Sequence, residues 1–180
     1  MKKGNKMQKV LVIGCCGAGK STFSKKLQSI LNVALIHLDR YYHKPNWEEP
    51  KKEEWERILN NLIKKPSWIM DGTYIELLDI RIEKCDTLIY LDYSILKCFF
   101  RVVKRVFTDY GKKRSDMAPG CKEEFDLEFL KYVLTFNYKN RANIYNILEK
   151  VKTTKDVIIL KKDKELDSFL SQLRERNQTP

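Results

Sequence analysis

The stretch Gly14-Cys15-Cys16-Gly17-Ala18-Gly19-Lys20-Ser21 decides the fold of this chain. It matches G-x-x-x-x-G-K-[ST], the pattern of the phosphate-binding P-loop. The run before it, residues 10–13, is continuously apolar and rich in β-branched side chains, as in a buried parallel strand. The apolar side chains of residues 21–31 recur at helical spacing. The pattern therefore lies between a predicted strand and a predicted helix, which is the context that a P-loop requires.

The P-loop assigns separate tasks to its residues. Its glycines let the backbone wrap closely around phosphate oxygens, and the N–H groups of the loop and the following helix favour an anion. Lys20 is expected to contact the β- and γ-phosphates of a nucleotide, and the Ser21 hydroxyl to ligate Mg²⁺. At variable positions of the pattern, Cys15 and Cys16 are either small filler or redox-sensitive thiols. The predicted nucleotide contacts are Gly14, Cys15, Cys16, Gly17, Ala18, Gly19, Lys20, Ser21 and Thr22.

Length and composition are typical of one globular domain. The 180 residues are 43% hydrophobic and 33% charged, which is enough for a core. No apolar run approaches the ~20 residues of a membrane span, and residues 1–6 do not begin a signal peptide, because the apolar run after them is only a strand long. The five cysteines form no C-x-x-C pair, so a reduced, cytoplasmic compartment is expected.

The net charge of +11 has two explanations: a nucleic-acid partner, which needs a clustered basic face, or a site for phosphorylated ligands. Acids are interspersed through most of the chain, but residues 97–114 contain one acid, Asp109. The cations of this segment are Lys97, Arg101, Lys104, Arg105, Lys112, Lys113 and Arg114. Phosphate binding is the preferred interpretation of the cluster, while a solvated face and nucleic-acid binding stay open.

Short apolar segments alternate with helical patterns along the chain. The predicted strands cover residues 10–13, 33–38, 68–70, 86–92 and 156–160. The predicted helices with defined ranges cover residues 21–31, 52–65, 125–149 and 163–176. Two more helices are expected, a short one that begins at a Thr73/Glu76 capping box and one that is capped by Ser94. This alternation predicts an α/β fold, a three-layer P-loop NTPase fold with a five-stranded parallel sheet covered on both faces.

Two predicted helices have apolar stripes that define a buried side. The helix after Ser94 is expected to bury Phe99, Val102, Val103, Val106 and Phe107. The stripe of residues 125–149 contains Leu127, Leu130, Leu134, Tyr138, Tyr145 and Leu148, with Arg141 inside it. Because an unpaired charge there would be costly, Arg141 is expected either to point into an active-site cleft, which is preferred, or to pair with a carboxylate.

Carboxylates follow three predicted strands at the sheet edge where open α/β folds bind ligands. Asp39 is expected to orient an acceptor hydroxyl or take its proton, or else to start a turn. Asp71, followed by Gly72, is the preferred candidate to hold Mg²⁺ through water. Asp92 competes for that role, although capping the next helix suits it better. His37 is expected to be a packed core histidine rather than a catalyst.

A loop at about residues 108–124 is long and begins with cations, which is typical of a lid. Arg101, Arg105 and Arg114 are candidates to clamp phosphate from that side. Arg81 is a candidate ligand for a phosphate on the acceptor.

The segment that would cover the acceptor is placed at about residues 39–66. Its aromatic side chains Tyr41, Tyr42 and Trp47 are expected to stack on a base or ring, or equally to pack on the domain. Together with Asp39, Asp71, Gly72 and Arg81, the two tyrosines make up the predicted acceptor contacts.

Four further segments join the P-loop in a narrower resemblance, namely Ile36–Asp39, Trp68–Tyr74, Asp86–Asp92 and Asp116–Cys121. Together they resemble the adenylate-kinase-like proteins named DNA topology modulation (FlaR-related) proteins. The resemblance covers about residues 8–150. It implies a nucleoside/nucleotide-kinase fold with strand order 2-3-1-4-5 and a lid after the fourth-strand helix. The family name records a genetic effect on DNA topology and implies no known chemistry.

Two wider resemblances bear on the acceptor. Asp71-Gly72 falls where adenylate kinases carry Asp-Gly-Phe-Pro-Arg, which implies the Mg²⁺ role for Asp71, although the Phe-Pro-Arg part is absent here. Asp39-Arg40-Tyr41-Tyr42-His43-Lys44-Pro45 is similar to the Asp-x-Phe-Tyr/Phe-Lys-Pro segment of uridine and nicotinamide riboside kinases, in which the Asp contacts the acceptor hydroxyl. This similarity implies a hydroxyl acceptor rather than an AMP-like phosphate acceptor.

We therefore expect an ATP- and Mg²⁺-dependent kinase of a small acceptor, which is a nucleoside, a nucleotide or another hydroxylated compound. The predicted catalytic residues are Lys20, Asp39, Arg101, Arg105, Arg114 and Arg141. Two alternatives stay open: a nucleic-acid-associated P-loop protein that influences DNA topology, and a nucleotide-binding regulator without turnover. No motif in the sequence separates ATP from GTP or defines the oligomeric state.

Overall fold

The computed structural model describes residues 7–178, so the prediction for residues 1–6 lies outside the described residues. Its centre is a five-stranded parallel sheet in the order β2-β3-β1-β4-β5. The strands are β1 (Lys9–Gly14), β2 (Leu35–His37), β3 (Trp68–Asp71), β4 (Thr87–Leu91) and β5 (Asp156–Leu160). The predicted fold class and strand order are confirmed. Because β1 is the central strand, the P-loop leaves the sheet at its middle.

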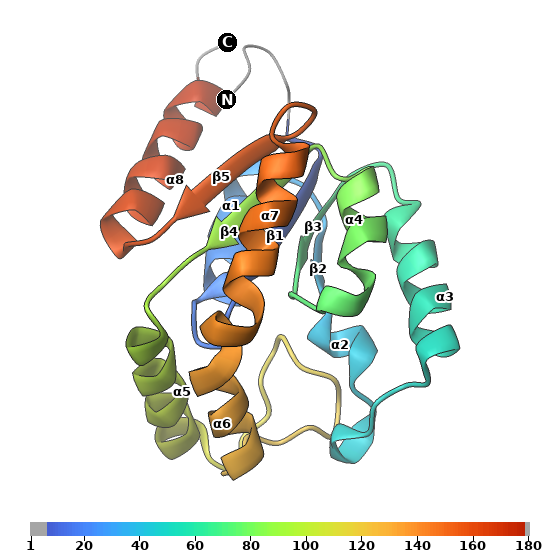
Figure 1. The fold of residues 1–180 in the computed structure, drawn as a ribbon, viewed down its shortest axis with the longest axis vertical. Helices are drawn as coiled ribbons and strands as arrows, with labels where there is room; N and C mark the ends of the chain where they lie inside the picture. The colour runs from blue at the N-terminus through green and yellow to red at the C-terminus, as the bar shows by residue number, and fades with distance from the viewer. Residues whose placement is uncertain (1–6, 179–180) are drawn as a thin grey trace.

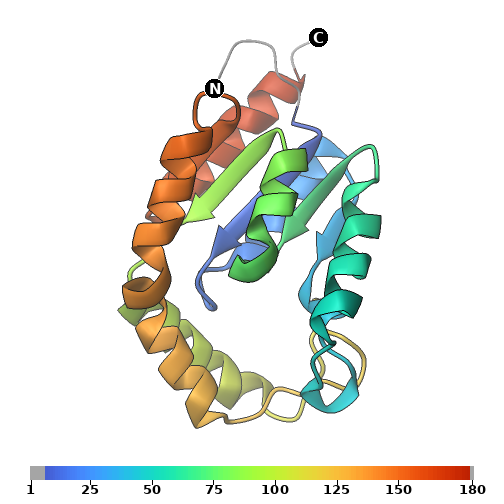
Figure 2. The same ribbon diagram turned by 45° about the vertical axis from the view of Figure 1, so that its right-hand side comes forward.

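Helices cover both faces of the sheet (Figure 1). On one face α1 (Lys20–Leu31) packs with α8 (Asp163–Gln178), and on the other lie α4 (Leu78–Lys84) and α7 (Ala142–Val151), with α3 (Lys52–Ile63) beside α4. The helices α5 (Ile95–Asp109) and α6 (Leu127–Phe136) pack on each other beyond the carboxyl ends of the strands (Figure 2). The short helices α2 (Asp39–Tyr42), η1 (Pro45–Trp47) and η2 (Ile75–Leu77) follow β2 and β3. None of the helices in residues 7–178 is long and apolar enough to cross a bilayer.

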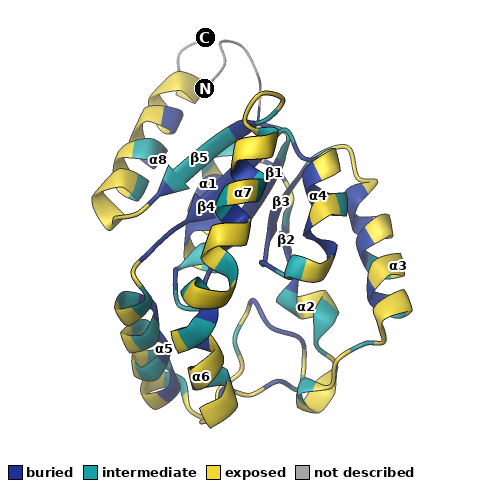
Figure 3. Cartoon of the chain, in the orientation of Figure 1, coloured by how far each residue is buried: buried dark blue, intermediate teal, exposed yellow. Residues whose placement is uncertain are grey.

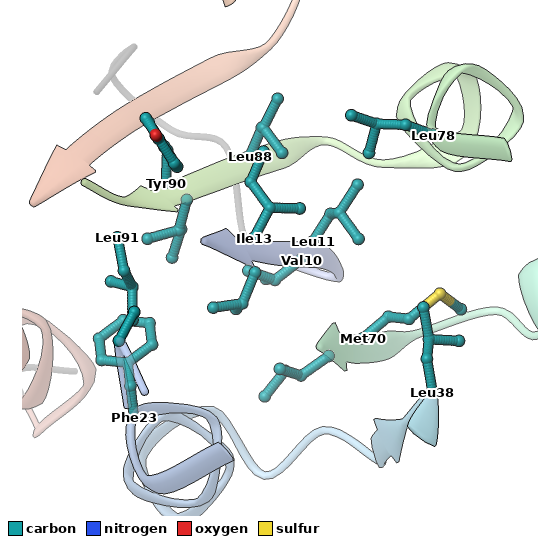
Figure 4. Packing of buried hydrophobic residues seen from close by; sticks show 14 of the residues in the cluster. Val10, Leu11, Ile13, Phe23, Leu38, Met70, Leu78, Leu88, Tyr90 and Leu91 are labelled. Atoms are coloured by element: carbon teal, nitrogen blue, oxygen red, sulfur yellow. The ribbon is translucent and has the colours of Figure 1, made fainter. Parts of the chain in front are cut away.

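The core lies on both sides of β1. Residues 10–13 are fully buried, and Phe23 of α1 and Leu78 of α4 approach the strands from opposite sides (Figure 4). The inner strands β3, β1 and β4 are buried along almost their whole length, whereas the middle of the edge strand β5 is half-buried and the outer faces of the helices are exposed (Figure 3). A strand covered on both faces needs apolar side chains pointing both ways, which explains the continuous apolar run before the P-loop.

The predicted helix over residues 125–149 is present, since the chain is helical from Leu127 to Val151, but it is not one regular α-helix. The structure has α6, a π-helical turn η3 (Asn137–Arg141) and α7 over this stretch. A π-turn contains i→i+5 hydrogen bonds, so the spacing of the residues on one face shifts at this turn. One apolar stripe with regular α-helical spacing therefore cannot describe the buried face of both α6 and α7. The side chains buried here are Leu130, Val133, Phe136, Ile144 and Leu148, whereas the predicted stripe members Leu127, Leu134 and Tyr138 are exposed.

The prediction for the helix after Ser94 is wrong at Phe107, which is 76% exposed. The buried side of α5 is formed by Cys98, Val102 and Val106. Apolar residues occur around much of the circumference of this helix, so the sequence pattern is compatible with two different buried faces. Packing against the P-loop and α6 selects the phase that buries Cys98.

Candidate active site

The P-loop connects β1 to α1, and its lysine is folded back over the loop. Lys20 Nζ donates hydrogen bonds to the carbonyl oxygens of Gly14, at 2.9 Å, and Cys15, at 3.1 Å. These acceptors are neutral, whereas a phosphate oxygen would add the attraction of an opposite charge to the hydrogen bond from the ammonium group. Nucleotide phosphates can therefore compete successfully for this ammonium group.

Thr73 anchors the first residue of the P-loop. Its hydroxyl accepts a hydrogen bond from the Gly14 N–H (3.1 Å) and donates one to the Gly14 carbonyl (2.7 Å). The predicted capping role of Thr73 is wrong, since no side chain caps η2. The threonine, which is the second residue after β3, instead joins the loop after β3 to Gly14 at the end of β1.

Gly17 is in contact with α5. Its φ is +81°, and a Cβ at this position would lie 2.3 Å from the carbonyl oxygen of Cys98. Glycine is required here by the close approach of a helix backbone as well as by the turn itself. Cys15 also faces the interior, since it is 3% exposed and its thiol donates to the Val133 carbonyl at 3.8 Å.

A cavity of about 1610 Å³ opens at the carboxyl ends of the strands. The predicted site residues that line it are Gly14, Cys16, Gly17, Ala18, Gly19, Lys20, Ser21, Thr22, Asp39, Tyr42, Asp71, Gly72, Arg101, Arg105 and Arg114. Cys15, Tyr41, Arg81 and Arg141 are not part of this lining.

Charged side chains from both sides of the cavity affect the pKa of the Cys16 thiol. Burial raises the pKa of the Cys16 thiol, and the carboxylate of Asp39 raises it further. Lys20, Arg105 and Arg114 act on the same thiol in the opposite direction. One P-loop side chain therefore lies within the electrostatic reach of a lysine, two arginines and an aspartate that come from four separate segments.

The two predicted carboxylates are held in different ways. The Asp71 oxygens lie 2.9 and 3.0 Å from Nδ1 of His37, and both residues are buried. His37 is thus a packed residue that orients Asp71. Asp39 is half-buried, and one of its oxygens accepts a 2.6 Å hydrogen bond from the hydroxyl of Tyr74.

Asp116 is a cavity residue to which the sequence patterns assigned no role. Its carboxylate forms two hydrogen bonds with the Arg114 guanidinium, at 3.1 and 2.6 Å. Burial alone would raise the pKa of Asp116, but hydrogen bonds from Arg114 and from the Ser21 hydroxyl hold it well below its usual range. A carboxylate next to the P-loop serine lies where a metal ion bound by Ser21 would be within its reach. Its position at the start of the Asp116–Cys121 segment was the available signal.

The three cavity arginines have carboxylate partners that lie outside the basic segment 97–114. Arg101 pairs with Asp163 at the start of α8 (3.0 Å), Arg105 with Glu123 (2.8 Å), and Arg114 with both Asp116 and Glu123. The cluster that contains one acid in the sequence is therefore balanced by acids elsewhere. These ion pairs hold the guanidinium groups at the cavity wall.

The cleft interpretation of Arg141 is wrong. Its guanidinium donates to both oxygens of Asp92, at 2.9 and 2.8 Å, and the Tyr145 hydroxyl donates to the same carboxylate at 2.7 Å. Asp92 is thereby committed to Arg141 and does not cap α5, whose cap is Ser94. The carboxylate-pair alternative for Arg141, which is the last residue of the π-turn, is the one that the structure shows.

The predicted role of Arg81 as a ligand for an acceptor phosphate is also wrong. Arg81 is fully buried, and its guanidinium group donates hydrogen bonds to backbone carbonyl oxygens. The acceptors are Gly72 (2.8 Å), Thr73 (2.6 Å), Tyr74 (2.6 Å) and Leu77 (3.1 Å). Four of its five N–H donors are used in this way, burial lowers the pKa of Arg81 to about 9, and the side chain does not line the cavity. Arg81 shapes the loop after β3 instead.

The aromatic residues of the 39–66 segment divide between cavity and surface. Tyr42 lines the cavity, whereas Tyr41 is 42% exposed and lies outside the lining. Trp47 donates from Nε1 to the Lys122 carbonyl (3.1 Å) and packs on the loop that contains Met117. Trp47 therefore packs on the domain, and because it also lines the cavity, its stacking on a base or ring stays a prediction.

Ser21, Asp71 and Asp116 together offer a hydroxyl and two carboxylates on one cavity. Mg²⁺ is bound in nucleotide sites by one or two carboxylates, with waters and substrate phosphates completing the octahedron. The donor set therefore fits Mg²⁺ held jointly with a nucleotide.

Comparison with known proteins identifies the fold. No family model matches the chain, and no curated protein matches it. Shikimate kinase from Bacteroides thetaiotaomicron has a similar structure, with a TM-score of 0.57 over 94% of this chain and 98% of that chain at 17% identity. A proposed kinase from Chloroflexus aurantiacus J-10-fl gives a TM-score of 0.56 over 95% and 98% at 12% identity. These similarities establish a P-loop kinase fold.

Proposed function

We propose that this protein is an ATP- and Mg²⁺-dependent kinase that transfers a phosphoryl group to a hydroxyl group of a small acceptor. The observation that carries the proposal is the shared cavity, which is lined by the P-loop residue Cys16 together with four charged residues. The charges of all four affect the pKa of the Cys16 thiol, and these residues are Lys20, Asp39, Arg105 and Arg114. Phosphoryl transfer needs a held donor, an aligned acceptor and cations around the moving charge. The cavity supplies each of these.

In this proposal the P-loop binds the nucleotide. Lys20 exchanges its bonds to the loop carbonyls for the β- and γ-phosphates, and the loop N–H groups bind phosphate oxygens. Ser21, with Asp71 through water, would hold Mg²⁺, which supplies neutralisation of the phosphate charge. Asp39 orients the acceptor hydroxyl and takes its proton.

We further propose a single domain of 180 residues, in which about residues 108–124 form a lid and about residues 39–66 cover the acceptor. Contacts between the two segments support this. The Cys121 thiol donates to the Lys44 carbonyl (3.3 Å), and Trp47 donates to Lys122. Because Arg114 lies on the lid segment, its position would control both phosphate contact and the exclusion of water.

Membership of the DNA topology modulation (FlaR-related) proteins remains part of the proposal. It is supported by the roles that two of its segments have in the cavity, since Trp68–Tyr74 provides Asp71 and Asp116–Cys121 begins with Asp116. The ion pairs of Arg101, Arg105 and Arg114 weigh against a free basic surface for nucleic acid. All five cysteines are free thiols, which supports a reducing cytoplasmic compartment.

The test is ATP consumption over a panel of nucleosides, nucleotides, sugars and amino alcohols. Lys20→Ala should reduce turnover by about 100-fold or more, since a cation on the transferring phosphate is lost. Lys150→Ala, an exposed lysine of α7, is the control and should behave like wild type. No ADP formation by wild type with any acceptor, or equal rates for wild type and Lys20→Ala, contradicts the proposal.

A further inference from the structure

The acceptor half of the cavity contains a three-ring aromatic cluster, formed by Tyr42 of α2, Trp55 of α3 and Tyr74 after β3. The ring centroids are 4.5 Å apart for Tyr42–Tyr74, 5.1 Å for Tyr42–Trp55 and 5.2 Å for Trp55–Tyr74. All three side chains line the cavity. The rings come from segments far apart in the sequence, so only the folded chain assembles this surface.

Three carboxylates face the aromatic cluster. Asp39 accepts the hydrogen bond from Tyr74. Burial, and then the neighbouring Glu49 carboxylate, raise the pKa of Tyr42 to about 12, and the charge of Glu76 acts in the same direction. Asp39, Glu49 and Glu76 all line the cavity. An aromatic surface with negative charges at its edge attracts a cation through both the ring faces and the carboxylates.

The nearby cations do not balance these acids. Arg114, whose charge reaches Asp39, is bonded to Asp116 and Glu123. Arg81 is buried under backbone carbonyls, and Lys44 pairs with Glu54 at 2.8 Å. Lys52 at the exposed start of α3 is the remaining cation on this wall among the described residues. An acceptor with its own phosphate or carboxylate would therefore meet net negative charge.

We propose that the acceptor is a hydroxylated amine, such as an amino alcohol or an amino sugar, whose protonated nitrogen lies against the Tyr42–Trp55–Tyr74 cluster with Glu49 and Glu76 as counter-ions. This inference rests on the proposed kinase function. The hydroxyl oxygen of the acceptor forms the new bond to the γ-phosphorus as the bond from that phosphorus to ADP breaks. The hydroxyl proton passes to Asp39, and the products are a phosphate ester and ADP.

The first experiment measures binding of matched compounds to the full chain in the presence of a non-hydrolysable ATP analogue and Mg²⁺. One triplet is glucosamine, glucose and glucuronate, and a second is ethanolamine, ethylene glycol and glycolate. Calorimetry at pH 7 should show at least one amine binding 10-fold or more tightly than its neutral partner, with the anion weakest. No binding by either amine, equal binding of amine and neutral compound, or preference for an anion overturns the inference.

Variants locate the cation site. The double variant Glu49→Gln/Glu76→Gln should weaken amine binding 10-fold or more and leave affinity for the neutral compound and for ATP unchanged. Glu56→Gln, an exposed glutamate of α3, is the matched control and should not weaken the amine. Tyr42→Phe keeps the ring and should retain more amine affinity than Tyr42→Leu. Unchanged amine binding in the double variant overturns the assignment of the counter-ions.

Failure of this inference is separable from failure of the kinase proposal. ATP binding, and its loss in Lys20→Ala, reports on the P-loop alone. A protein that binds ATP and phosphorylates a neutral or anionic acceptor retains the kinase function and overturns the amine assignment. A protein that binds amines at this wall without binding ATP overturns the kinase function.

Discussion

The hydroxyl of Thr73 bonds to both backbone groups of Gly14, accepting from its N–H and donating to its carbonyl oxygen. The same carbonyl accepts a hydrogen bond from Nζ of Lys20. Thr73 from the loop after β3 and Lys20 of the P-loop therefore both bond to Gly14, the last residue of β1. The geometry of the nucleotide site depends on a side chain 59 positions away from the glycine that it holds.

Thr73→Val removes this anchor. Leaving the Gly14 groups buried without their partner should lower the free energy of unfolding by about 1–3 kcal/mol, and ATP affinity should fall severalfold because the loop is less constrained. Thr87→Val is the control, since Thr87 is 1% exposed and bonds to Asp86 at the opposite end of β4. It should lose stability without losing ATP affinity. Denaturant titrations and calorimetry with ATP measure both effects, and equal ATP affinity in the two variants would contradict this account.

Gly17→Ala tests the contact between α5 and the P-loop. Gly111 provides a matched control, since its φ of +71° is close to the +81° of Gly17 but a Cβ added there would have nothing within 4 Å. Gly111→Ala should therefore show backbone strain alone, about 1–2 kcal/mol. Gly17→Ala should lose at least ~2 kcal/mol more, because the Cys98 carbonyl cannot move without shifting α5. Urea unfolding compares the free energies of unfolding of the two variants. Similar losses would show that α5 can shift away from the P-loop at little cost, which contradicts the prediction.

Arg81→Met should be destabilising, because it leaves the carbonyls of Gly72, Thr73 and Tyr74 unpaired in the interior. We expect a loss of about 3 kcal/mol or more, with little change in KM for the acceptor at temperatures where the variant is folded. Arg57→Met, at an exposed position of α3, should stay within about 0.5 kcal/mol of wild type. If Arg81→Met instead kept its stability and raised KM selectively, Arg81 would be a substrate ligand after all.

The pairing of Asp116 predicts an acid-sensitive stability. Its pKa in the folded protein lies below its usual range because Arg114 and Ser21 hydrogen-bond the carboxylate. A depressed pKa contributes stability that is present above the unfolded-state value of about 4 and is lost as the pH falls below it. The free energy of unfolding of the wild type should therefore fall more steeply between pH 5 and pH 3, about one unit either side of that value, than that of Asp116→Asn. Urea titrations across this interval measure the slopes, and parallel slopes would exclude Asp116 as the source.

Prediction from the sequence succeeded where the signal is local. The P-loop is eight contiguous residues, and the strands are short apolar runs. The errors arose where one pattern allowed several structures. The apolar spacing of residues 125–149 does not reveal the π-turn within the helix, and Phe107 fits the apolar stripe of α5 by spacing although its side chain is exposed.

The ligand roles of two arginines could not be judged from the chain order. Arg81 is bonded to backbone carbonyls that only the fold after β3 brings together. Arg141 is paired with Asp92, 49 residues earlier. A charge in a sequence carries no information about which acceptor will reach it, since hydrogen bonds depend on distances of about 3 Å that long-range packing sets.

By itself the sequence determined the fold class, the position of the P-loop between a strand and a helix, and the carboxylates near the carboxyl ends of β2 and β3. These follow from periodicity and from residues adjacent in the chain. Only the tertiary structure decided that Thr73 holds Gly14, that Asp116 lies beside Ser21, and that three aromatic rings and three carboxylates share one wall of the cavity. The physical reason is that these contacts join segments whose spacing is fixed by the packing of helices on the sheet and by no local preference of the backbone.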